Sequence, residues 1–351
     1  MEPSAPTLPP PKRRRFFTWR RCVFAFLAAL PCLWLGGVGV LSGWQLARPP
    51  GREAGEQQRR EMADPTRIGL RVQSARTGSG IPYFLVTPDP VAGPGERGAK
   101  LRAELAAMGE TLPAYGFTDA TMVLLHGRNS SKDRLLGVAE RFAASGFRCL
   151  IPDLPGHGEL KDRGCGYGAG AGEAGLAREV ADDATARFSL PTDQPRLLWG
   201  FSMGGSFAIH AAAAEPADWA GLVVVASFAR LDEVVIPHLA RWSGPGLKIS
   251  RRVAGWAASQ AGGLEPWKVR PATAAAKTTT PTLILHGDED PFIPVSQGRR
   301  LFESLGARDK SWVEVKGANH WTVLGTPQPV YAEMTRWARQ HARSWTPPET
   351  S

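Results

Sequence analysis

The sequence predicts an α/β fold, in which helices cover both faces of a mostly parallel sheet. From residue 121 onward, short apolar runs alternate with helical patterns, and this alternation favours a parallel sheet. The expected strands of this part are 121–125, 147–151, 196–201, 221–226, 282–285 and 311–315. The carboxyl ends of parallel strands lie along one edge of a sheet, so we expect functional side chains there.

Two further strands are expected before this alternation. Residues 67–75 alternate apolar and polar side chains, and residues 81–87 follow a Gly-Ser-Gly turn, which is typical of strands. The expected helices lie near 98–109, 132–145, 173–189, 203–214, 295–305 and 328–343. Residues 227–278 combine helical and loop patterns and are expected to form a small helical cap between the sixth and seventh strands. The domain then covers about 67–343, and 344–351 is a tail.

An uncharged apolar stretch of 23 residues, 22–44, lies near the amino terminus. As a helix it spans about 34 Å, which is enough to cross a hydrocarbon core of about 30 Å. A basic tail, residues 1–21, precedes it, and Trp19 and Trp44 lie beside its ends. By the positive-inside rule we expect a single-pass protein with a cytoplasmic tail and an extracytoplasmic domain.

Three interpretations of this stretch compete. A retained signal anchor is favoured, because the run is longer than the core of an ordinary signal peptide and no A-x-A site follows. A cleaved signal followed by export is the second, since RRRFF at 13–17 resembles a twin-arginine signal. A buried core helix is the third, and its glycines weaken it. Residues 45–66 are expected to be a linker, so a fragment from about residue 60 should be soluble and active.

Charge and cysteine content exclude several classes of function. Residues 1–21 carry five of the nine net positive charges, which leaves little support for a nucleic-acid partner. The four cysteines form no C-x-x-C pair, and the acids at 288–290 lack the spacing of a calcium loop, so no metal is expected. The G-x-G-x-x-G match at 170–175 does not follow a strand, and no other cofactor motif is present. The glycine-rich segment 164–175 is expected to be a mobile loop over the site.

Ser202 is the candidate nucleophile. It lies in the G-x-S-x-G sequence GFSMG at 200–204, between an apolar strand and a helix of small residues. A nucleophile elbow needs this junction, because the serine sits in a strained turn and the glycines let strand and helix pass closely. The competing interpretation is an ordinary serine at a helix start.

His320 and an acid of the preceding loop are the candidate partners of Ser202. His320 follows the last expected strand, and an imidazole there would take the serine proton and return it to the leaving group. Asp288, Glu289 and Asp290 follow the strand before it. A buried carboxylate would fix the imidazole tautomer, but the residue pattern does not choose among the three acids.

The order of these residues, serine, acid and histidine, resembles that of the α/β-hydrolase superfamily over about residues 67–343. The similarity is greatest to serine aminopeptidase-like and monoacylglycerol-lipase-like hydrolases. It is carried by LLHGRN, DLPGHG, GFSMGG, HGDEDPFIP and GANHW. The resemblance implies Asp290 as the acid, because Ile293 and Pro294 follow it, and the backbone N–H groups of Arg128 and Met203 as the oxyanion hole. The DLPGHG loop lacks the arginine and serine that relatives often carry there, which leaves its anchoring open.

The resulting hypothesis is a membrane-anchored serine hydrolase that cleaves a carboxylic ester, as an esterase or lipase does, through an acyl-enzyme and without a cofactor. Its substrate would be a small ester or a lipid-like molecule. An aminopeptidase with the same triad would need a cap acid for the substrate amine, and Asp232, Glu233 and Glu265 are available. A non-catalytic binding protein is the third class. Three cap tryptophans are expected to line an acyl pocket or to pack the core of the cap: Trp242, Trp256 and Trp267.

Overall fold

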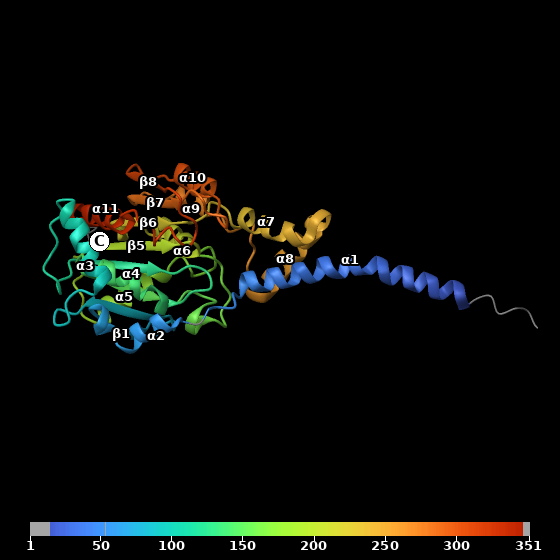
Figure 1. Ribbon diagram of the computed structural model, residues 1–351, viewed down its shortest axis with the longest axis horizontal. Coiled ribbons are helices and arrows are strands. Elements are labelled where there is room, and N and C mark those ends of the chain that lie inside the picture. Colours follow the sequence, from blue (N-terminus) through green and yellow to red (C-terminus); the bar gives the residue numbers. More distant parts are fainter. Residues whose placement is uncertain (1–14, 53, 347–351) are drawn as a thin grey trace, which may run out of the picture.

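A single eight-stranded sheet forms the centre of the molecule (Figure 1). The computed structural model describes residues 15–52 and 54–346, so the twin-arginine-like residues Arg13 and Arg14 and most of both tails lie outside the described residues. In spatial order the strands are β1 (Leu70–Arg76), β2 (Pro82–Pro88), β4 (Phe147–Pro152), β3 (Ala120–Leu125), β5 (Arg196–Phe201), β6 (Gly221–Val225), β7 (Thr282–Gly287) and β8 (Lys310–Val315). Only β2 runs against its neighbours β1 and β4, and all other pairs are parallel. The predicted fold class is confirmed.

Helices cover both faces of the sheet, because successive strand residues point to opposite sides. Leu198 and Leu222 pack with one group of helices, whereas their neighbours Trp199 and Val223 pack with the other. The first group comprises α5 (Leu176–Arg187), α6 (Met203–Ala214), α9 (Pro271–Ala275) and α10 (Val295–Ser304). The second comprises α4 (Leu136–Ala144) and α11 (Val330–Ser344), with α3 (Glu96–Ala107) packed against both. Each expected helix is present within a few residues.

A buried lysine anchors the DLPGHG loop after β4. The Nζ of Lys132 lies 2.8 Å from Asp153 Oδ2 and 2.6 Å from Glu159 Oε1, and the Lys132 N–H donates to Asp153 Oδ1. The Lys132 and Asp153 side chains are almost fully buried. Lysine therefore supplies a cation to this loop, which lacks the arginine of the family pattern.

The cap consists of α7 (Leu231–Ser243) and α8 (Leu247–Gly262), and both helices contact the amino-terminal helix α1 (Arg15–Ala47). In Figure 1, α1 projects away from the sheet, and α7 and α8 lie beside its second half. The segment Arg21–Ala47 is long and apolar enough to cross a membrane. Phe24 and Leu33 are 76% and 65% exposed. The interpretation of this helix as a buried core helix is therefore wrong.

The predicted linker 45–66 needs correction. Helix α1 continues to Ala47, and Leu46 and Ala47 are buried in the core of the domain. The carbonyls of its last turn accept hydrogen bonds from Arg128 Nη2, the Tyr167 hydroxyl and the Cys165 N–H, so this helix end is capped by the domain itself. The segment also contains the helix α2 (Glu56–Ala63).

These contacts change the expectation for a fragment that begins near residue 60. Such a fragment would lose two core residues, Leu46 and Ala47, together with the partner of α8. The proline and glycine content of the segment marks where α1 ends, but it does not reveal that the preceding residues pack into the domain.

Candidate active site

Ser202 lies at the sharp turn between β5 and α6. Its backbone has φ 54° and ψ −116°, a region that costs a residue with a side chain about 1–3 kcal/mol. The Ser202 N–H donates to the carbonyl of Val225, 2.8 Å away. A Cβ on Gly204 would lie 2.0 Å from the Leu125 carbonyl oxygen, and one on Gly200 would lie 2.3 Å from that of Gly204. The neighbouring glycines therefore make this close turn possible.

The structure brings His320 and Asp290 together with Ser202. His320 Nε2 lies 3.1 Å from Ser202 Oγ, and His320 Nδ1 lies 2.6 Å from Asp290 Oδ2. The other carboxylate oxygen, Oδ1, accepts the N–H groups of Phe292 and Ile293 at 2.9 and 2.8 Å. Ser202, His320 and Asp290 are each at least nine-tenths buried. This arrangement can pass a proton from a hydroxyl to an imidazole that a carboxylate holds in place.

The two neighbouring acids of the loop point elsewhere. Asp288 Oδ1 accepts the N–H of Gly317 at 2.7 Å, and its other oxygen lies 3.5 Å from Lys316 Nζ. Glu289 is exposed. Of the three acids that the sequence left open, only Asp290 therefore contacts His320.

His286 is a residue of the site that the sequence did not single out. Its Nε2 donates to the Ile293 carbonyl at 2.8 Å and lies 3.6 Å from Asp290 Oδ2. Burial lowers the pKa of His286 below its ordinary value. A neutral His286 thus fastens the loop that carries Asp290. In the sequence, its position at the end of a strand whose loop carries the candidate acids is the feature that could have identified it.

Aromatic rings surround the imidazole of His320. The ring centroids of Phe201, Phe292 and Trp321 lie 5.1, 5.8 and 5.2 Å from that of His320. Arg52 lies over the outer ring, Trp321, at 5.5 Å. The site therefore has an apolar, aromatic rim around His320.

The two residues predicted to form the oxyanion hole belong to segments that meet at the elbow. Met203 is the first residue of α6, where helix N–H groups lack partners within the helix. Arg128 follows Gly127, where an added Cβ would lie 2.9 Å from the Phe201 ring. The Arg128 side chain bonds to Gln45 of α1, 2.7 Å away.

The glycine-rich segment 164–175 is packed around a buried carboxylate. Glu173 accepts the N–H groups of Gly166 and Gly168 at 2.7 and 2.8 Å. Burial raises the pKa of Glu173, and its hydrogen bonds to the glycines act in the opposite direction. The segment also buries Tyr167 and Cys165, whose Sγ lies 3.7 Å from Met203 Sδ. The glycines of this segment therefore direct N–H groups at one acid, and the mobility of the segment stays a prediction.

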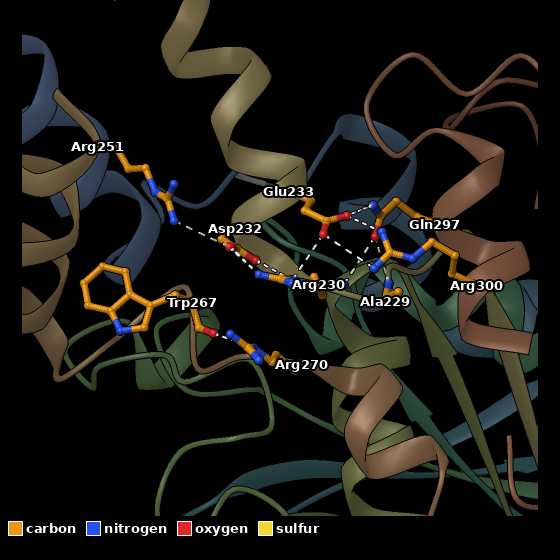
Figure 2. Close-up of polar contacts among 9 residues, drawn as sticks. All are labelled: Ala229, Arg230, Asp232, Glu233, Arg251, Trp267, Arg270, Gln297 and Arg300. Atoms are coloured by element: carbon orange, nitrogen blue, oxygen red, sulfur yellow. Dashed lines mark hydrogen bonds and ion pairs between the residues drawn. The ribbon is translucent and has the colours of Figure 1, made fainter. Parts of the chain in front are cut away.

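The cap acids that the aminopeptidase hypothesis requires are all paired with cations (Figure 2). Arg230 binds both oxygens of Asp232, at 3.1 and 2.9 Å. Glu233 pairs with Arg230 and Arg300 and accepts a hydrogen bond from Gln297. Outside the figure, Glu265 lies 2.5 Å from Lys268.

Two of the three cap tryptophans do not behave as expected. Trp242 and Trp256 are 61% and 60% exposed, so they neither line a pocket nor pack a core. Only Trp267 packs inside the cap, where its ring closes on Gly255. Among the residues that the structure describes, no three His, Cys, Asp or Glu side chains gather as metal ligands would.

Comparisons with known proteins agree with this fold. The family model for serine aminopeptidase, S33, matches residues 117–265 and 269–326. A monoacylglycerol lipase of Mycolicibacterium smegmatis is 24% identical over 63% of this chain and 88% of its own. An esterase of Pyrococcus furiosus superposes with a TM-score of 0.56 at 13% identity, over 84% of this chain and 98% of its own. An α/β-hydrolase of a Penicillium species gives 0.51 at 15% identity, over 78% and 99%. The chain therefore belongs to the serine aminopeptidase S33 family of α/β-hydrolases.

Proposed function

We propose that this protein is a membrane-anchored serine hydrolase that cleaves carboxylic esters through an acyl-enzyme. The observation that carries the proposal is the continuous hydrogen-bonded chain from Ser202 through His320 to Asp290. Ser202 Oγ attacks the acyl carbon while His320 Nε2 takes its proton. His320 then returns that proton to the departing alcohol, and Asp290 stabilises the imidazolium in between.

The second half of the reaction uses the same groups. His320 takes a proton from water, the hydroxide attacks the acyl carbon, and the acid leaves as Ser202 regains its proton. In both halves of the reaction, negative charge develops on the oxygen of the acyl group. The backbone N–H groups of Arg128 and Met203 are proposed to hold it, each worth about 3 kcal/mol.

An ester, and not a peptide with a free amine, is the substrate favoured by the cap. An amine-binding carboxylate must be free to pair with the substrate ammonium. Arg230 and Lys268 already neutralise the acids at 232 and 265, and Arg230 and Arg300 neutralise Glu233. The similarity to a monoacylglycerol lipase also favours a lipid-like ester.

The proposal predicts a clear preference among chromogenic substrates. We expect p-nitrophenyl esters of rising chain length to be hydrolysed, and aminoacyl-anilides to be turned over far more slowly. The measurement is kcat/KM for both series with the full-length protein in detergent. Faster cleavage of the anilides would replace the esterase assignment by the aminopeptidase one. Loss of both activities in Ser202→Ala would place both reactions at this site.

The anchor is proposed to be retained and to place the hydrolase domain outside the cytoplasm. We expect the protein to sediment with membranes, to resist extraction by salt and to be released by detergent, since an apolar helix is not held by charge. A carboxyl-terminal reporter that works only outside the cytoplasm would agree with the orientation, and one that works only inside would invert it. A mature amino terminus between residues 40 and 50 would favour the cleaved form.

A further inference from the structure

We propose that the tip of the cap, the turn between α7 and α8, is immersed in the outer half of the bilayer that α1 spans. Its occupant would be phospholipid, with acyl chains against the apolar side chains and phosphate groups against the cations of α8. This inference rests on the proposed membrane anchor, and it goes further by placing the cap at membrane depth.

Helix α8 packs against α1 at two glycines spaced four residues apart. A Cβ on Gly39 would lie 2.7 Å from the Val253 Cβ, and one on Gly43 would lie 2.0 Å from the Ala254 carbonyl oxygen. By contrast, Gly36 and Gly37 face open space. Small residues at this spacing let the backbones of two helices approach closely, as they do inside membranes.

Hydrogen bonds fix how far along α1 the cap reaches. Ser250 Oγ donates to the Leu35 carbonyl at 3.1 Å, and Trp34 Nε1 donates to the Trp242 carbonyl at 3.1 Å. At the other end Arg48 Nε donates to the Ala261 carbonyl at 2.6 Å. Helix α8 therefore runs beside residues 35–48 of α1 and in the same direction, since its first turns meet Leu35 and its last turn meets Arg48.

This register places the start of α8 below the membrane surface. The uncharged run 22–44 is about 34 Å long, only about 4 Å more than the hydrocarbon core. Leu35, beside the start of α8, lies nine residues before Trp44, or about 13 Å deeper along the helix. Even if the whole excess length lies at the outer end, the start of α8 is about 10 Å inside the core.

The exposed chemistry of the cap tip suits this position. Trp242, Ile249 and Trp256 are 61%, 52% and 60% exposed, and lipid would cover apolar side chains that the protein itself leaves uncovered. Lys248 and Arg252 are exposed, and residues 247–262 contain no acid. Long cationic side chains bury their stems in the hydrocarbon and extend their charged ends toward the lipid phosphates.

Depth-dependent quenching in proteoliposomes tests the placement. The full chain, with Cys22→Ser, Cys32→Ser and Ile249→Cys, is labelled with bimane and reconstituted in phosphatidylcholine with phosphatidylglycerol. We expect lipids with a nitroxide on the acyl chain to quench the label severalfold more than aqueous iodide does. The matched control is Phe117→Cys, an exposed apolar site before β3, at the sheet edge opposite Ser202, where iodide should dominate.

A second label separates this proposal from the anchor on which it rests. Bimane on the native Cys32 of α1 reports whether that helix is inserted. Lipid quenching at 32 with iodide quenching at 249 would overturn the placement of the cap and leave the anchor standing. Iodide quenching at both sites would overturn both. Neither result depends on the esterase activity, which is measured separately with a water-soluble ester.

A pair of glycine variants tests whether α8 is held at this depth by α1. Gly43→Leu forces a side chain into Ala254, whereas Gly37→Leu meets open space on the same helix. With bimane at 249, we expect Gly43→Leu to shift quenching from lipid toward iodide and Gly37→Leu to leave it unchanged. Equal behaviour of the two variants would contradict the helix contact.

Discussion

A Ser202→Ala variant is expected to lose ester hydrolysis by several orders of magnitude while keeping its fold. The change removes the nucleophilic oxygen, Ser202 Oγ, which lies 3.1 Å from His320 Nε2. Alanine keeps the Cβ that already occupies the strained turn, so little else changes. Steady-state kinetics with p-nitrophenyl butyrate measures the loss, and a thermal melt checks the fold. The rate that remains measures the acceleration that the oxyanion hole and substrate binding provide without the nucleophile.

Covalent labelling makes the same prediction without turnover. A fluorophosphonate probe should label the wild-type protein and not Ser202→Ala. The matched control is Ser206→Ala, one turn further along α6, whose hydroxyl is buried and donates to the Tyr167 carbonyl. That variant should still be labelled. Labelling that persists in Ser202→Ala would place the nucleophile elsewhere, and a protein with no esterase activity in either form would favour the binding-protein hypothesis.

The parallel part of the sheet could be predicted because its strands are buried on both faces. Such strands are short continuous apolar runs, and 121–125 and 221–226 show this pattern plainly. The residues at which elements begin and end could be predicted less accurately than the elements themselves. The segment at 67–75 begins as a short 3₁₀ helix, Pro65–Ile68, before β1 starts at Leu70, since alternation continues through the turn.

The triad residues could be located because each follows a strand, but the choice of acid could not be made from chemistry alone. Asp288, Glu289 and Asp290 are adjacent in the sequence, and each carries a carboxylate that could pair with a histidine. What separates them is the turn that directs the N–H groups of Phe292 and Ile293 onto Asp290. Family resemblance supplied that choice in advance.

The relation of the cap to α1 could not be predicted, because it depends on contacts between segments far apart in the chain. Gly39 and Gly43 appear in the sequence only as residues that weaken a helix in water. Their role becomes visible when Val253 and Ala254 are found against them. The same holds for Glu173, whose partners are glycines that suggested flexibility.

Asp290→Asn is expected to reduce kcat by about 10⁴-fold through the tautomer of His320. The two N–H groups of Phe292 and Ile293 require an oxygen at the Oδ1 position. The amide of asparagine must then turn its NH₂ group toward His320 Nδ1. That nitrogen becomes the acceptor, so the imidazole proton moves to Nε2. A protonated Nε2 of a neutral imidazole cannot accept the proton of Ser202.

Asp288→Asn is the matched control for this argument, because it makes the same chemical change two residues away. Asp288 accepts the N–H of Gly317 through one oxygen and faces Lys316 with the other, at the surface. Asparagine keeps the first contact and loses a partly exposed ion pair worth about 1 kcal/mol or less. We therefore expect kcat to change little, and the same for Glu289→Gln. A large loss in Asp288→Asn together with a small one in Asp290→Asn would mean that the 2.6 Å contact of His320 with Asp290 is not the one used in catalysis.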